Sequence, residues 1–153
     1  MEIKLTPAEY GKKARAYFEQ GYNCSQAVLL SFGDLTGLDE KTAAMISSSF
    51  GGGRLREVCG AVSGMFMAAG LIQAYSDPKA QEEKAEHYAF IQSLAESFKA
   101  ENGSIICREL LGLPGASKPI PEKRTESYYR RRPCADYVEY AAKALAAKLS
   151  NND

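Results

Sequence analysis

The chain lacks a surplus of charge of either sign, because its 153 residues include 19 basic and 19 acidic side chains. A neutral balance gives no electrostatic reason to expect a nucleic acid or an anionic membrane surface as the main partner. A long hydrophobic run is missing as well: the longest apolar stretch, residues 58–72, contains three glycines and is too short to span a bilayer. We therefore expect no nucleic-acid partner and no spanning helix, while peripheral association with a membrane stays open.

The first residues contain no apolar run of signal-peptide length, which predicts a cytoplasmic protein. Strand-like alternation of apolar and polar residues is also missing, and the chain has no internal repeat. Hydrophobic residues make up 45% of the chain and charged residues 25%, a balance that excludes a disordered tail. Because this length suits one hydrophobic core, we expect a single domain over residues 1–153.

Helical spacing of apolar residues, interrupted by capping and breaking signals, predicts an all-α bundle of six or seven helices. Thr6, Asn23 and Asp39 are typical N-cap residues, and the glycine run 51–53 marks a break. The expected helices run from about Pro7 to Gly21, from Cys24 to Phe32, from Asp39 to Phe50, from Val58 to Tyr75, from Asp77 to Ala100, from Ser104 to Leu111 and from Pro133 to Leu149. The proline-containing segment 112–132 is expected to be the one long loop.

No two of the four cysteines form a C-x-x-C pair, which excludes a thioredoxin-like motif and a zinc ribbon. A C-x-x-C-H sequence is missing too, so we expect no covalently bound haem. In a reducing cytosol, this many cysteines is more typical of catalytic, redox or metal-binding residues than of disulfide staples. The alternative is that each is a small buried apolar side chain. The cysteines are Cys24, Cys59, Cys107 and Cys134.

All four cysteines are expected in or near the first turn of a helix, where unpaired backbone N–H groups stabilise a thiolate. Arg54 and Arg56 precede Cys59, so this thiol is the first candidate for a lowered pKa. Consecutive helices in an up-down bundle alternate in direction, which predicts that the cysteines meet at one end. We expect at least three sulfurs there to lie within reach of one metal ion or of disulfide formation.

The same four cysteines are therefore the candidate catalytic residues and the candidate metal ligands. Four thiolates suit zinc or an iron–sulfur cluster, and two disulfides would use the same side chains. The first hypothesis is thiol–disulfide or electron-transfer chemistry, with the question of an enzyme left open. The second is a metal-binding protein. The third is a non-catalytic binding module with structural cysteines, partnering a transporter or an oxidoreductase, and each hypothesis leaves a homo-oligomer open.

The glycine run leads directly into an arginine, and Gly52, Gly53 and Arg54 are candidate cofactor-binding residues. Glycines let backbone amides approach an anionic group, and an arginine adds positive charge. The segment is not a Walker loop, since no Lys-Ser or Lys-Thr follows, and no strand precedes it as a dinucleotide fingerprint requires. A plain turn is the alternative. The only histidine, His87, is expected to border the core and not to be a ligand.

Residues 59–64, Cys-Gly-Ala-Val-Ser-Gly, read C-G-A-x-x-G. With Cys24 upstream and Cys107 and Cys134 downstream, the pattern resembles the C-GCAxxG-C-C family of redox-active proteins, whose label spells the middle motif slightly differently. The resemblance covers nearly the whole chain. It implies that the four cysteines are the site, that the source is bacterial or archaeal, and that the partner is a redox protein or a transporter.

Overall fold

The computed structural model describes residues 1–151, which form helices and connecting loops. Within this range there are nine α-helices and one short 3-10 helix, and the only bridge between extended segments joins Val58 to Ile106. The predicted all-α class is therefore confirmed, and six of the helices have seven or more residues. None of the helices in this range combines the length and apolarity that a bilayer-spanning segment requires.

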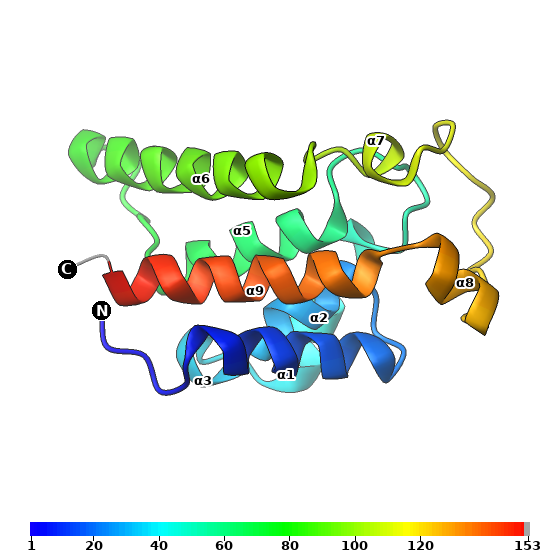
Figure 1. Cartoon of the computed structure of the whole chain (residues 1–153). Coiled ribbons are helices and arrows are strands. Elements are labelled where there is room, and N and C mark those ends of the chain that lie inside the picture. Colours follow the sequence, from blue (N-terminus) through cyan, green and yellow to red (C-terminus); the bar gives the residue numbers. More distant parts are fainter. Residues whose placement is uncertain (152–153) are drawn as a thin grey trace.

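The helices are α1 (Pro7–Glu19), α2 (Cys24–Ser31), α3 (Gly33–Thr36), α4 (Glu40–Ser47), η1 (Ser48–Phe50), α5 (Gly60–Ile72), α6 (Gln81–Asn102), α7 (Cys107–Leu111), α8 (Glu126–Arg131) and α9 (Cys134–Asn151). The helix α9 lies at the centre, between α1 and α6 (Figure 1). It runs antiparallel to α1 and also packs on α2 and α5. Its fully buried positions include Val138, Leu145 and Leu149, which follow helical spacing on the face turned to the core.

The first helices begin where the capping signals place them. The side chains of Thr6 and Asp39 accept hydrogen bonds from backbone N–H groups of the first turns of α1 and α4. Asn23 does the same for α2, and the Gln26 side chain returns a bond to the backbone of Asn23, which completes a capping box. These local bonds explain why the sequence alone located three helix starts to within one residue.

The packing of α5 against α2 depends on small residues. A Cβ atom on Gly60 would lie 2.9 Å from the Cβ of Cys24, and one on Gly64 would lie 2.5 Å from the backbone oxygen of Ser25. Two backbones can come this close only where side chains are missing, which is the use of glycine at close helix crossings. The pair therefore brings the first turns of α2 and α5 together.

Several boundaries differ from the prediction. Asp77 and Pro78 lie in a turn, and α6 begins only at Gln81. The helix α5 begins at Gly60, because the preceding Val58 is bridged to Ile106. The expected loop 112–132 contains α8, which its proline content concealed and which the Thr125 side chain caps by accepting from a backbone N–H.

Candidate functional site

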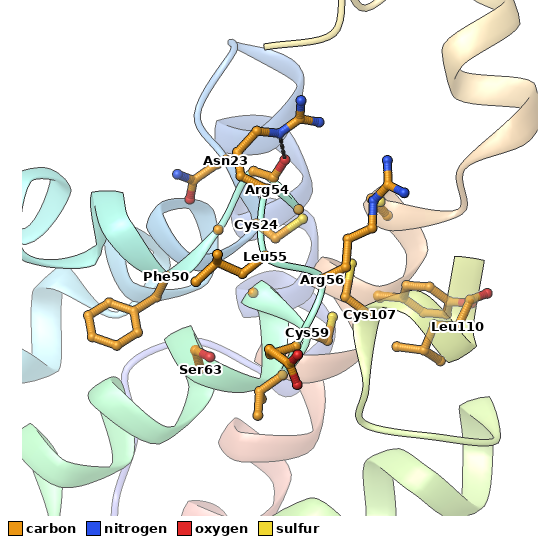
Figure 2. Close-up of a pocket in the computed structure, with 18 of the residues that line it drawn as sticks. Asn23, Cys24, Phe50, Arg54, Leu55, Arg56, Cys59, Ser63, Cys107 and Leu110 are labelled. Atoms are coloured by element: carbon orange, nitrogen blue, oxygen red, sulfur yellow. Dashed lines mark hydrogen bonds between the residues drawn. The ribbon is translucent and has the colours of Figure 1, made fainter. Parts of the chain in front are cut away.

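A cavity of about 490 Å³ lies at the end of the bundle where α2, α5, α7 and α9 begin. All four cysteines line it. Figure 2 shows three of them, Cys24, Cys59 and Cys107, around the cavity from different parts of the chain, with the loop of residues 51–58 beside them. The predicted meeting of the cysteines at one end of the bundle is confirmed, and they are free thiols in this structure.

Each cysteine occupies a helix start, as the sequence predicted. Cys24, Cys107 and Cys134 are the first residues of α2, α7 and α9, and Cys59 is the N-cap of α5. The prediction was wrong in one detail, because Ile106 and not Ser104 is the N-cap of α7. The Ser104 hydroxyl accepts from the backbone N–H of Ile106, which precedes the first residue of the helix.

Two backbone hydrogen bonds hold the segments of Cys59 and Cys107 side by side. The N–H of Cys59 donates to the carbonyl of Ile105 at 2.8 Å, and the N–H of Cys107 donates to the carbonyl of Glu57 at 2.6 Å. These bonds flank the antiparallel bridge and occupy the backbone N–H groups of both cysteines. Nothing in the local sequence signals this pairing, since the partners are almost fifty residues apart in the chain.

Cys24 and Cys134 lie at the starts of α2 and α9, and each thiol shifts the pKa of the other. A hydrogen bond between them lowers the pKa of Cys134, and the positive charges of Arg132 and Arg124 lower it further against the effect of burial. The same hydrogen bond, together with burial, raises the pKa of Cys24 well above its usual value. The two thiols therefore titrate as a pair, in which Cys134 loses its proton before Cys24 does.

The pKa values of the other two thiols are both raised. Burial raises the pKa of Cys59 to about 12, although the backbone N–H groups of Ala61 and Val62 favour its thiolate. Burial also raises the pKa of Cys107, with the charges of Arg132, Arg56 and Arg54 opposing. The prediction that Cys59 has the lowered pKa is therefore wrong: its side chain is 5% exposed, and desolvation outweighs the helix terminus.

A model of the family described as "Putative redox-active protein (C_GCAxxG_C_C)" matches residues 22–148. The chain belongs to the C_GCAxxG_C_C family. This confirms the resemblance read from the cysteine pattern, and the matched range contains all four cysteines. No curated protein and no solved structure matches the chain significantly.

The structure gives the C-G-A-x-x-G motif of this family member a physical meaning. Its cysteine caps α5 at the cavity, and its two glycines, Gly60 and Gly64, are the positions where α2 approaches most closely. The alanine between them, Ala61, is fully buried. The motif thus positions Cys59 and lets the helix that carries Cys24 pack beside it.

Sharing a cavity does not amount to a metal centre. In the part of the chain that the structure describes, no three His, Cys, Asp or Glu side chains form a group that could hold a metal ion. The expectation of three sulfurs around one ion is therefore not met in this conformation. Zinc or iron–sulfur ligation by Cys24, Cys59, Cys107 and Cys134 stays a prediction.

The loop that contains the candidate cofactor-binding residues Gly52, Gly53 and Arg54 is held to another segment by hydrogen bonds to backbone carbonyls. Gly52 and Gly53 have positive φ angles of 81° and 67°, so the turn itself requires glycine. The Arg54 guanidinium donates to the carbonyls of Gly52, Lys118 and Ile120, which ties the loop of residues 51–58 to residues 112–125. All three candidate cofactor-binding residues line the cavity, and the turn reading accounts for the glycines.

Sequence reasoning missed Arg124 and Tyr128, which also line the cavity. The Arg124 guanidinium stacks on Phe18 and donates to the carbonyls of Phe18 and Tyr22 at the end of α1. No local pattern marks such a contact across a hundred residues. His87 lies outside the cavity lining, with its Nδ1 3.1 Å from the carbonyl of Gln73, in agreement with the prediction that it borders the core.

The two opposite pKa shifts predict an order of alkylation. As the pH rises, Cys134 should react with iodoacetamide first, because a lowered pKa gives it a larger thiolate fraction at every pH below its usual titration range. Cys59 should react only as the pH approaches about 12. Peptide mass spectrometry after timed labelling measures each thiol, and in denaturant all four should converge. Labelling of Cys59 ahead of Cys134 in the folded chain would contradict the assignment.

Proposed function

We propose that this protein carries out thiol–disulfide exchange with Cys134 as the attacking thiolate and Cys24 as the resolving thiol. The observation that supports this most directly is that both thiols line the cavity from the starts of α2 and α9, with the pKa of Cys134 lowered and that of Cys24 raised by their interaction. A low-pKa thiol beside a second, protonated thiol is the arrangement that such exchange requires. Membership of a family described as redox-active agrees with it.

In the first step the Cys134 thiolate attacks one sulfur of a disulfide R–S–S–R′. A Cys134–S–S–R bond forms, the bond between the two substrate sulfurs breaks, and R′–S⁻ leaves. In the second step the Cys24 thiol gives up its proton and attacks the sulfur of Cys134, which forms the Cys24–Cys134 disulfide and releases R–S⁻.

Two electrons thereby pass from the two cysteines to the substrate. The released thiolates take up one proton from Cys24 and one from solvent, so the products are two thiols and one protein disulfide. The steps run backwards when a dithiol reduces the pair. Arg132 and Arg124 favour the thiolate form of Cys134 throughout, because their charges lower its pKa.

The test is to oxidise the chain with one equivalent of a small disulfide and to map the new bond by mass spectrometry. We expect an intramolecular Cys24–Cys134 disulfide that dithiothreitol reverses. A disulfide confined to Cys59 and Cys107, or none at all, would overturn the proposal. Elemental analysis of the anaerobically purified chain is the companion measurement, since zinc or iron bound in proportion to protein would support the metal hypothesis instead.

A further inference from the structure

The cavity has an apolar rim that is unusually open to solvent. Phe50 is 55% exposed, Leu55 is 70% exposed and Val58 is 42% exposed, and all three line the cavity. Figure 2 shows Leu55 near Cys24, with Phe50 further from the labelled thiols on the other side of Leu55. Deeper in, Met67 and Leu110 continue the apolar wall. A volume of about 490 Å³ with this lining matches a small organic molecule with an apolar body.

Positive charge gathers on the same wall. The lining contains the four arginines Arg54, Arg56, Arg124 and Arg132. The only acidic side chain in the lining, Glu57, is bound to Arg108 at 2.9 Å. The lining of this cavity therefore carries an excess of positive charge.

Arg132 pairs with Glu122, and the charge of Arg54 also lowers the pKa of that carboxyl, but Arg56 and Arg124 have no carboxylate partner within the described chain. Within the described chain, the polar partners of three of the arginines are backbone carbonyls: those of Gly52, Lys118 and Ile120 for Arg54, that of Pro114 for Arg56, and those of Phe18 and Tyr22 for Arg124. A carbonyl satisfies a hydrogen bond without cancelling the charge. An anion that enters the cavity would meet this charge away from bulk water, where it is screened less.

Arg132 has a buried N–H group that is free to donate a hydrogen bond to a ligand. Its side chain is 8% exposed, its guanidinium pairs with Glu122 at 2.6 Å, and its Nε has no acceptor within the described chain. The Nε of Arg56, a half-buried residue, is buried and without an acceptor in the same way. A buried N–H without a partner is unfavourable, and an anionic ligand atom would satisfy it.

From the cavity, its arginines and these two donors, we propose that the site takes a low-molecular-weight disulfide or thiol that carries a carboxylate on an apolar body. This inference rests on the proposed thiol–disulfide exchange and names its substrate class. The apolar body lies against the rim, the carboxylate lies at Arg132 and Arg56, and the sulfur faces Cys134.

The first experiment compares two aromatic disulfides of similar size, the dianionic dithiobis(nitrobenzoate) and the neutral dithiodipyridine. The ratio of their rates cancels changes in the reactivity of Cys134, which both reagents share. We expect the rate with the dianionic disulfide, divided by the rate with the neutral one, to be higher for the folded chain than for the denatured chain. Arg132→Gln or Arg56→Gln should lower the ratio about tenfold, since a hydrogen bond to a charged group is lost.

Matched variants separate this effect from a general change in charge. Arg130→Gln removes the same charge two residues from Arg132, from an exposed side chain outside the lining, and should leave the ratio within about twofold. Arg132→Lys should lower the ratio of the two rates less than Arg132→Gln does, because lysine keeps the positive charge although it lacks the paired N–H donors of the guanidinium. If Arg132→Gln fails to fold, Arg56→Gln carries the test alone.

A binding measurement removes the thiol chemistry. In the Cys24→Ser/Cys134→Ser double variant, we expect naphthoate to bind more tightly than the neutral naphthamide, and Arg56→Gln in that background should abolish the difference. Equal binding of the two, with a rate ratio unchanged by both arginine variants, would overturn the anionic substrate class while leaving the exchange reaction intact. If naphthoate binds selectively but the unsubstituted chain reacts with neither disulfide, the proposed function is wrong and the anion site is still supported.

Discussion

In the Cys134→Ser variant, the fast phase of exchange with a small disulfide at neutral pH is expected to slow at least about tenfold. The remaining thiols have raised pKa values. For Cys59, with a pKa of about 12 against a usual 9.0, the thiolate fraction falls about a thousandfold, and the greater nucleophilicity of a more basic thiolate restores about thirtyfold of this. A stopped-flow absorbance trace of the released thiol measures the rate.

The Cys24→Ser variant should give a different signature. Its fast phase should persist, because Cys134 still attacks, but only one equivalent of thiol should leave and the mixed disulfide on Cys134 should accumulate. The unsubstituted chain should release two equivalents, and circular dichroism checks that both variants fold. If Cys134→Ser keeps its fast phase, or if Cys24→Ser still releases two equivalents, the assigned roles are wrong.

The second large effect is expected on stability. Gly64→Ala places a methyl group 2.5 Å from the backbone oxygen of Ser25 and 3.0 Å from the Cβ of Val28. Neither atom is the far end of a flexible side chain, so the helices α2 and α5 must separate. We expect a loss of about 3 kcal/mol in the free energy of unfolding, or about 10 °C in melting temperature. Calorimetry and denaturant unfolding measure both.

The same helix offers a matched control. A Cβ on Gly70 would meet no atom within 4 Å, and its backbone is helical. Gly70→Ala should therefore be neutral or stabilise the fold by up to about 1 kcal/mol, because alanine favours a helix over glycine. Two variants of equal stability would show that α5 does not depend on Gly64 for its approach to α2. Separation of the helices should also remove the early alkylation of Cys134, since Cys24 would move away.

Much of the fold could be predicted because its signals are local. Caps such as Asn23 and Asp39 satisfy N–H groups within the same turn, so a few neighbouring residues decide where a helix begins. The glycine break and the apolar spacing act over equally short distances. The segment 112–132 was harder, because its prolines indicate a loop while one threonine cap is enough to begin the six-residue α8.

The site followed from the same logic up to a point. Helix starts carry all four cysteines, and alternating helix directions bring those starts to one end, so the sequence by itself predicted that the four cysteines share one cavity. The helix terminus also suggested Cys59 as the thiolate, which was wrong. Local signals predict the unpaired N–H groups near a thiol but not how much protein covers it, and desolvation is the larger effect here.

What the sequence determined, then, is the longer helices, the four thiols and their common end of the bundle, because each depends on residues close together in the chain. Only the tertiary structure decided which thiol has the lowered pKa. The contact between Cys24 and Cys134, the burial of Cys59, and the return of Arg124 to the end of α1 each join residues a hundred or more positions apart or depend on all the helices around one side chain. Such contacts are set by packing, and a proton moves with the charges and the solvent that packing leaves near it.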